Sequence, residues 1–184
     1  MARTEIRISG FGGQGVILAG KLLAWAGTDY GLHVTWLPSY GPEMRGGTAN
    51  CTIVLSDEPI GSPVVDDPSG LIAMNLPSLD RFEKAVARAG TIVVNSSLVT
   101  RRVERDDVQE LALPLNDIAG SLGNPRAANM VALGALIKAT GAVPLEIVQR
   151  AMGTMLGHKA SIELVEVNER ALEAGFKAVQ NRAQ

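Results

Sequence analysis

The segment Glu5-Ile-Arg-Ile-Ser-Gly10-Phe-Gly-Gly-Gln-Gly15-Val-Ile-Leu-Ala-Gly20 decides the fold class of this chain. Its first five residues alternate between polar and apolar side chains, which predicts a short strand over 5–9. A glycine-rich turn follows, and the next residues predict a helix over 14–30. Residues 33–38 predict a second strand. Strand, glycine turn, helix and strand in this order are typical of the start of a doubly wound α/β domain.

The rest of the chain continues to alternate between strands and helices. Further strands are predicted over 48–56, 71–74, 91–94 and 110–113, and further helices over 77–89, 125–140, 144–156 and 161–182. Asn124 before Pro125 is typical of a helix start, because the asparagine caps free backbone N–H groups and the proline needs no partner. The chain has 184 residues and shows no linker or repeat. We therefore expect a single domain over residues 1–184.

Composition excludes several classes of protein. Cys51 is the one cysteine, which is too few for an internal disulfide, a zinc site or a four-cysteine cluster. The net charge of -2 is spread along the chain, unlike the basic patch of a nucleic-acid-binding protein. No apolar run is long enough to cross a membrane, and residues 1–9 lack the apolar stretch of a signal peptide. We expect a soluble, cytoplasmic protein without a membrane or nucleic-acid partner.

Two predicted helices lack a polar face. Residues 16–27 contain Lys21 as their one charged side chain, and residues 127–137 contain none. A helix that is apolar all round is buried all round. We expect at least one of the two to pack against a partner chain, and we expect the isolated chain to form a homodimer. The alternative is that the sheet and helices of the domain itself cover both.

The glycine turn matches the dinucleotide-binding pattern at Gly10, Gly12 and Gly15. Glycines let the backbone approach a phosphate, and the start of the following helix supplies free N–H groups. An NAD site also needs an acidic residue at the end of the second strand, where this chain has Ser39 and Tyr40. The turn predicts either a site for an anionic group, such as a coenzyme phosphate, or tight packing of strand and helix without a ligand.

The remaining candidate groups do not form a catalytic constellation. The segment from Gly15 to Leu22 approaches the P-loop spacing, yet Leu22 has no hydroxyl to bind Mg²⁺. Cys51 lies on the apolar face of its strand, as expected of a buried thiol. His33 and His158 are far apart and fit no metal or triad spacing. We therefore predict no catalytic residue and no metal site in this chain.

A second unusual loop, Ser39-Tyr-Gly-Pro-Glu-Met-Arg-Gly-Gly47, follows the second predicted strand. It combines Tyr40, Glu43 and Arg45 with three glycines and a proline. Ligands of open α/β sheets bind at the carboxyl ends of the strands, where such loops lie. Arg45 is able to clamp a carboxylate or phosphate with two parallel hydrogen bonds. The alternative is that Glu43 and Arg45 form an ion pair on the surface.

Three segments resemble the gamma subunit of 2-oxoacid:ferredoxin oxidoreductases: Gly10–Gly20, Pro38–Cys51 and Gly123–Met130. Their order and spacing also fit this family, over residues 5 to about 180. The resemblance implies a three-layer α/β/α domain with a Rossmann-like start. It also implies a subunit of an enzyme complex that converts a 2-oxoacid into an acyl-CoA and passes electrons to ferredoxin. The isolated chain is expected to be inactive.

The resemblance also implies cofactors and partners. Thiamine diphosphate and iron–sulfur clusters are expected on other subunits, CoA on or between subunits, and none of them on this chain alone. The expected partners are alpha and beta subunits, a delta subunit where one is present, and ferredoxin through the complex. The loop after Trp36 resembles the 2-oxoglutarate enzymes most, with pyruvate, branched-chain oxoacid and indolepyruvate enzymes as close relatives.

The predicted site lies in the two glycine-rich loops. We expect these loops to line the edge of the domain that faces the coenzyme or the other subunits. The residues concerned are Gly10, Gly12, Gly13, Gln14, Gly15, Tyr40, Glu43, Arg45, Gly46 and Gly47.

Overall fold

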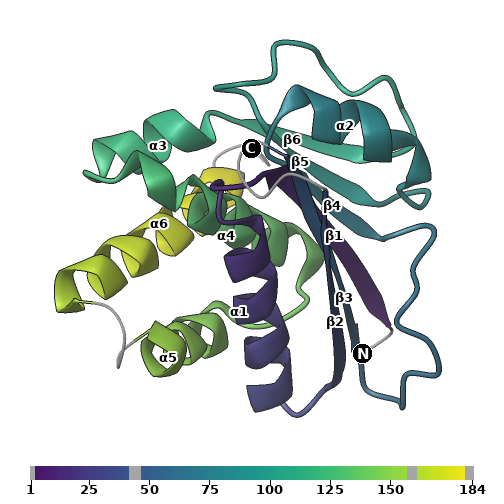
Figure 1. Cartoon of the computed structure of the whole chain (residues 1–184), viewed down its shortest axis with the longest axis horizontal. Helices are drawn as coiled ribbons and strands as arrows, with labels where there is room; N and C mark the ends of the chain where they lie inside the picture. Colours follow the sequence, from purple (N-terminus) through teal and green to yellow (C-terminus); the bar gives the residue numbers. More distant parts are fainter. Residues whose placement is uncertain (1–2, 42–46, 157–160, 181–184) are drawn as a thin grey trace.

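The computed structural model describes residues 3–41, 47–156 and 161–180, which form a six-stranded sheet with helices on both faces (Figure 1). The strands are β1 (Thr4–Phe11), β2 (His33–Tyr40), β3 (Thr48–Ser56), β4 (Gly70–Ala73), β5 (Thr91–Asn95) and β6 (Gln109–Leu113). The helices are α1 (Val16–Asp29), α2 (Leu76–Phe82), α3 (Leu115–Ser121), α4 (Ala128–Thr140), α5 (Leu145–Leu156) and α6 (Ile162–Gln180). Short 3-10 turns lie at Glu83–Ala85 and Pro125–Ala127.

The order of the strands is β2-β3-β1-β4-β5-β6. β1, β4, β5 and β6 pair in parallel, whereas β3 is antiparallel to both of its neighbours, β1 and β2. β3 therefore lies between β1 and β2, whereas the doubly wound start predicts that these two strands are neighbours. The sequence pattern predicts the direction of a strand after a crossover helix, but it does not specify which strand will lie next to it.

α4 is buried within the chain's own layers. All its residues from Ala128 to Ile137 are buried, and α3, α5 and α6 pack around it on the side away from the sheet (Figure 1). Where α4 crosses α6, a Cβ atom on Gly134 would collide with the backbone of Leu172, and one on Gly175 would collide with that of Val131. The two glycines let the helix backbones approach closely. This apolar helix therefore needs no partner chain to cover it.

α1 is covered only in part. One face packs against β1, β2, β3 and α5, whereas Leu18 and Trp25 on the other side are 37% and 41% exposed. Of the two apolar helices, α1 is therefore the one that stays a candidate for contact with a partner chain. Among the described residues, no helix combines the length and the apolar character needed to cross a bilayer. The cytoplasmic location stays a prediction.

The opposite face of the sheet has a thinner cover. α2 packs on β4 and β5, and the segment 57–69 reaches β1, where Arg7 donates from Nη2 to the Val65 carbonyl oxygen at 2.6 Å. The single helix predicted over 77–89 is shorter than expected. After Phe82 it tightens into a 3-10 turn, and the extended backbone at Val86 lets Ala87 donate its N–H to the Pro68 carbonyl oxygen.

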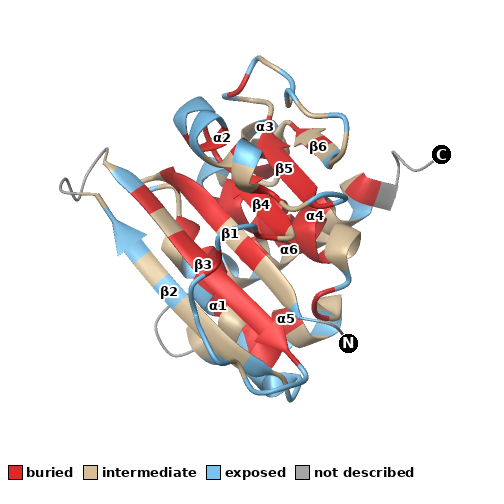
Figure 2. Cartoon of the chain, turned by 90° about the vertical axis from the view of Figure 1, so that its right-hand side faces the viewer, coloured by how far each residue is buried: buried red, intermediate tan, exposed pale blue. Residues whose placement is uncertain are grey.

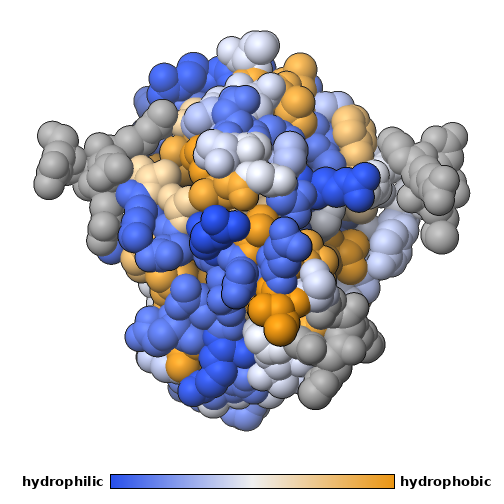
Figure 3. Space-filling model, turned by 90° about the vertical axis from the view of Figure 1, so that its left-hand side faces the viewer, coloured by the Kyte–Doolittle hydropathy of each residue, from blue (hydrophilic) through white to orange (hydrophobic). Residues whose placement is uncertain are grey.

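Exposed residues lie at the margin of the sheet and at the start of α6. Figure 2 shows β3 as mostly buried, whereas β2 at the margin of the sheet is intermediate or exposed. Figure 3, which looks onto the side of α5 and α6, shows apolar groups in orange between polar ones. Ile162 and Leu164, at the start of α6, are among the exposed large apolar residues.

Candidate functional site

The three segments that carry the family resemblance meet at the carboxyl end of β1. Phe11 at the end of β1 pairs with Thr48 at the start of β3, and the Gly12 N–H donates to the Gly47 carbonyl oxygen at 2.9 Å. Asn129 in the first turn of α4 donates from Nδ2 to the Gly15 carbonyl oxygen at 3.0 Å, across 114 residues of sequence. The fold thus brings these separate segments into direct contact around one turn.

Gln14 holds the turn from within. Its Oε1 accepts hydrogen bonds from the Phe11 N–H at 2.7 Å and from Asn75 Nδ2 at 3.0 Å. Its Nε2 donates to the Met74 carbonyl oxygen at 3.5 Å, and its backbone N–H donates to the Phe11 carbonyl oxygen at 3.1 Å. These bonds tie the turn to the end of β4. They direct the side chain of Gln14, a predicted site residue, into the protein.

Three positions in the turn require glycine, each for a different structural reason. A Cβ atom on Gly10 would lie 2.8 Å from both Gln14 Oε1 and Val16 Cγ2, so Gly10 is required by packing. Gly15 has a φ of +72°, and a Cβ atom there would collide with the Asn129 side chain. Gly13 has a φ of +98° and nothing within 4 Å of its Cβ position. Gly13 therefore presents bare backbone to open space, where a ligand or another chain can approach.

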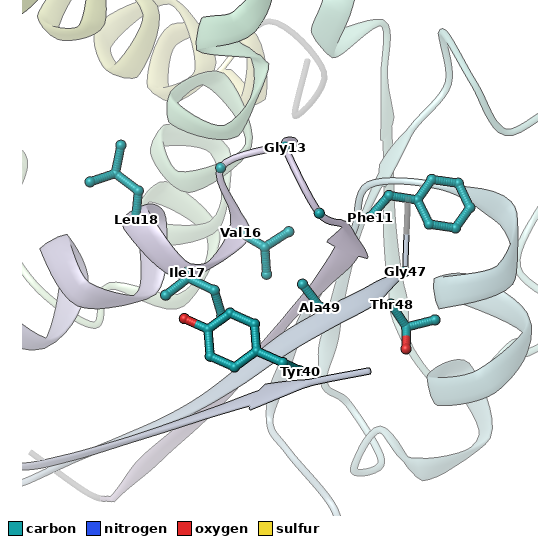
Figure 4. Close-up of a pocket in the computed structure, with 11 residues that line it drawn as sticks. Phe11, Gly13, Val16, Ile17, Leu18, Tyr40, Gly47, Thr48 and Ala49 are labelled. Carbon is teal, nitrogen blue, oxygen red and sulfur yellow. The ribbon is translucent and has the colours of Figure 1, made fainter. Parts of the chain in front are cut away.

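A cavity of about 310 Å³ opens beside the turn (Figure 4). Its lining consists of Phe11, Gly12, Gly13, Gly15, Val16, Ile17, Leu18, Tyr40, Gly47, Thr48 and Ala49. Figure 4 shows the ring of Tyr40 beside Ile17, so that the end of β2 and the start of α1 form two of the walls. The volume and the largely apolar walls are typical of sites for small molecules.

The start of α1 supplies the main positive potential of this cavity. The first backbone N–H groups of a helix have no partner within the helix and favour an acceptor or an anion. The Ala19 N–H is bonded to the Gly15 carbonyl oxygen at 3.0 Å, so the free N–H groups precede Ala19. The first turn of α1 contains no acidic residue, and the described residues that line the cavity carry no charge. The cavity suits an uncharged chain with a polar or anionic end.

The structure brings most of the predicted site residues together. Gly12, Gly13, Gly15, Tyr40 and Gly47 line the cavity, while Gly10 and Gln14 support the turn behind it. Glu43, Arg45 and Gly46 lie outside the described residues.

Sequence reasoning missed the apolar walls of the cavity and the role of Asn129. The unusually apolar face of the helix over 16–27 was the signal that could have revealed the walls, since Val16, Ile17 and Leu18 all line the cavity. No local signal indicated the bond from Asn129 to Gly15.

Two nucleotide-binding interpretations are inconsistent with the structure. β3 occupies the place beside β1 that the second strand takes in a dinucleotide-binding fold, and the described end of β2 carries Ser39 and Tyr40 where such a site needs an acid. The segment from Gly15 to Leu22 begins at the N-cap of α1 and runs into the helix, so it forms no phosphate-binding loop.

Cys51 is buried where α1 crosses β3, as the sequence predicts. Its Sγ lies 3.6 Å from the Val16 carbonyl oxygen, and a Cβ atom on Gly20 would collide with it. Burial raises the pKa of the Cys51 thiol to about 12, and interactions with Trp36 and the Gly20 backbone oppose this only in part. The thiol stays protonated at neutral pH and is not a nucleophile.

Fold and site together define a class: a mixed α/β domain with a glycine turn, an open apolar cavity and, among the described residues, no catalytic constellation. The family model for pyruvate ferredoxin/flavodoxin oxidoreductase matches residues 5–178, and the chain belongs to this family.

Several similar relatives are subunits of oxidoreductases. The chain is 41% identical to the ketoisovalerate oxidoreductase subunit VorA of Methanothermobacter thermautotrophicus, over 93% of this chain and 35% of that protein. It therefore spans about a third of the length of that relative. It is 39% identical to the 2-oxoglutarate synthase subunit KorC of Methanocaldococcus jannaschii, over 82% of each chain.

A solved structure confirms the fold. The crystal structure of a keto/oxoacid ferredoxin oxidoreductase gamma subunit from Geobacter sulfurreducens superposes with a TM-score of 0.82 at 32% identity. The superposition covers 97% of this chain and 99% of that one. The α/β fold expected from the sequence is thereby confirmed.

Proposed function

We propose that the chain is the gamma subunit of a 2-oxoacid:ferredoxin oxidoreductase complex. Such a complex oxidatively decarboxylates a 2-oxoacid, forms an acyl-CoA and passes electrons to ferredoxin. Membership of the family supports this, as does the similarity to a gamma subunit and to KorC over most of their own lengths. The proposed partners are the alpha and beta subunits, a delta subunit where present, and ferredoxin through the complex.

We propose 2-oxoglutarate as the substrate of the complex. The 39% identity to KorC over 82% of both chains supports this choice. A branched-chain 2-oxoacid is the second candidate, and the 41% identity to VorA favours it. The site on this chain does not discriminate between them, because the 2-oxoacid reacts on the thiamine diphosphate that the other subunits are proposed to hold.

The residues of this chain do not fit an iron–sulfur cluster. A cluster needs several thiolate ligands, whereas the chain has one cysteine, and burial keeps that thiol protonated. Among the residues that the structure describes, no group of three or more His, Cys, Asp or Glu side chains is placed to hold a metal ion. The proposed role of the chain is therefore to assemble the complex and to form part of a binding surface.

The glycine turn and its cavity are the proposed contact with CoA or with the catalytic subunits. The observation that carries this proposal is the meeting of three separate segments around an open cavity whose described lining includes no catalytic side chain. The free N–H groups of α1 suit an acceptor, and the apolar walls suit the flexible arm of the coenzyme. Tight packing accounts for Gly10 and Gly15, and the positive φ of Gly13 accounts for the glycine there, whose bare backbone leaves the tip open to a ligand.

Co-purification from native cells tests the subunit assignment. A tagged chain is expected to bring subunits that contain thiamine diphosphate and iron–sulfur clusters, with CoA-dependent reduction of a viologen dye. The 2-oxoacid with the highest activity then identifies the enzyme. A chain that purifies alone and inactive would overturn the assignment.

The two tyrosines of the chain offer a matched test of the cavity. Tyr40 lines the cavity and is 63% exposed, whereas Tyr30 is 45% exposed at the far end of α1. In the whole complex, Tyr40→Ala is expected to raise the KM for CoA about tenfold, as one lost ligand contact does. Tyr30→Ala is expected to leave it unchanged.

The alternative outcomes separate binding from packing. If the Tyr40→Ala chain no longer co-purifies with its partners, the cavity is a subunit contact. If Tyr40→Ala changes neither assembly nor the KM for CoA, the cavity has neither role.

A further inference from the structure

β2 is an edge strand that lacks charged side chains. Natural edge strands are blunted by charged side chains, proline, bulges or a covering element, because their free N–H and C=O groups invite another strand, and of these devices β2 carries Pro38. Among the described residues, β2 pairs with β3 alone and lies at the margin of the sheet (Figure 2). Its sequence HVTWLPSY contains no Lys, Arg, Asp or Glu, and Leu37 and Tyr40 are 46% and 63% exposed.

The proline in β2 determines which backbone groups face outward. Proline has no N–H, so within a sheet it takes a position whose N–H would face away from the neighbouring strand. Pro38 pairs with Cys51 of β3. Because inward and outward positions alternate along an antiparallel pair, the backbone groups of Val34, Trp36, Pro38 and Tyr40 face the open edge.

The outward-facing backbone groups of β2 are able to pair with the same groups of a second copy in an antiparallel arrangement. If Trp36 faces Trp36 of a second copy, the two residues exchange two hydrogen bonds. Val34 of each copy then faces Pro38 of the other and donates its N–H to the proline carbonyl oxygen. The missing proline N–H removes only one bond from each of these outer pairs.

The exposed stripe of α1, formed by Lys21, Trp25 and Asp29, is compatible with the same two-fold arrangement of two copies. Trp25 lines a cavity of about 350 Å³ together with Trp36, so the two tryptophans lie at the same level of the edge. Lys21 lies one turn before Trp25 and Asp29 one turn after it, and all three are exposed. A two-fold axis beside Trp25 and Trp36 places Lys21 of each copy opposite Asp29 of the other. Opposite charges therefore meet on both sides of an apolar centre.

We propose that two copies of this chain associate through the β2 edge and the exposed stripe of α1, about a two-fold axis near Trp25 and Trp36. The two sheets continue into one another, and Trp25 is covered by the second copy. The complementary charges of Lys21 and Asp29 distinguish a second copy from an unrelated strand, which has no reason to carry them in this spacing. The interface leaves the tip of the glycine turn at Gly13 free for other subunits.

Sedimentation equilibrium of the full chain over a range of concentrations tests this dimer. Lys21→Glu and Asp29→Lys are each expected to weaken dimerisation about tenfold, because each reversal brings like charges together at two symmetric contacts. The double variant K21E/D29K restores opposite charges and is expected to return the dimer to near its original affinity. Lys84→Glu, an exposed reversal beside α2 on the opposite face of the sheet, serves as the matched control.

Tryptophan fluorescence gives a second readout, because Trp25 and Trp36 are the only two tryptophans of the chain. Association is expected to shift the emission maximum to shorter wavelength as water leaves Trp25. The proposal is overturned if the wild-type chain stays monomeric. It is equally overturned if a dimer forms that Lys21→Glu does not weaken, or if K21E/D29K fails to restore it. None of these outcomes depends on which reaction the complex catalyses.

Discussion

The Cys51 thiol fills the space that Gly20 leaves open between α1 and β3. Because position 20 has no side chain, the helix lies close enough to the strand for Sγ to reach the Val16 carbonyl oxygen at 3.6 Å. The same closeness removes water from the thiol and raises the pKa of Cys51 from 9.0 to about 12. The missing side chain at Gly20 thus explains both the close packing of α1 on β3 and the raised pKa of the Cys51 thiol.

The raised pKa of Cys51 predicts a loss of stability in alkali. Below the unfolded-state pKa, both states carry the proton and the thiol adds no pH dependence. Between 9.0 and about 12, the unfolded thiol ionises while the folded one stays protonated, so stability falls as pH rises. The unfolding free energy is expected to fall by up to about 1.4 kcal/mol per pH unit from this group.

Urea unfolding at several alkaline pH values measures this slope. Cys51→Ala removes the thiol and serves as the control for the lysines and tyrosines that titrate in the same range. The slope of the variant is expected to be shallower than that of the wild-type chain. Equal slopes would show that the folded thiol ionises like an exposed one.

At the scale of elements, the crossing of α4 and α6 depends on two glycines. Gly134→Ala and Gly175→Ala each place a methyl group against a backbone carbonyl that cannot move aside easily. Each is expected to cost about 3 kcal/mol, or roughly 10 °C in Tm for a domain of this size. Thermal unfolding followed by circular dichroism measures the loss.

A third helical glycine provides the matched control. Gly153 lies inside α5 with nothing within 4 Å of its Cβ position. Gly153→Ala is expected to leave Tm unchanged or raise it slightly, because alanine favours a helix by about 1 kcal/mol over glycine. A similar loss in all three variants would mean that helix propensity, rather than the crossing, is responsible.

Local patterns in the sequence predicted most helices and strands, but few of the pairings between them. The strand, turn and helix over 5–30 are local, and the structure confirms them. Asn124 is a cap as predicted, but it caps a 3-10 turn over Pro125–Ala127 that leads into α4. α3 was missed, because a seven-residue helix shows barely two turns of periodicity. The insertion of β3 between β1 and β2 depends on pairing between distant segments, for which a single sequence carries no signal.

The candidate site was predictable to a similar extent. Glycine spacing identified the turn, because the demand for glycine at Gly10 and Gly15 arises from close packing nearby. The cavity beside it needs Tyr40 and Ala49 from two other strands. Their positions beside the turn follow only from the order of the strands in the sheet. Tyr40 was therefore predicted as a site residue because it belongs to an unusual loop, not because of the residues that it contacts.

At the scale of the whole molecule, the main core is continuous and closed. It runs from β1 and α1 through α4 to α5 and α6, and α4, which is buried from Ala128 to Ile137, lies at its centre. The isolated chain is therefore expected to fold without its partners. Its thermal unfolding should be cooperative, and its near-ultraviolet circular dichroism should show fixed aromatic side chains. A broad transition that sharpens only when partner subunits are added would contradict this.

On the ribosome, the glycine turn leaves the exit tunnel long before Asn129 is translated. The nascent chain can pair β1 with β3 and dock α1, yet the Gly15 carbonyl oxygen gains its bond from Asn129 only after another 114 residues have been added. Chains that terminate before α4 are therefore expected to lack a finished turn. Because this contact completes the site only after α4 has been made, subunits that recognise the turn would bind only chains whose synthesis has passed α4.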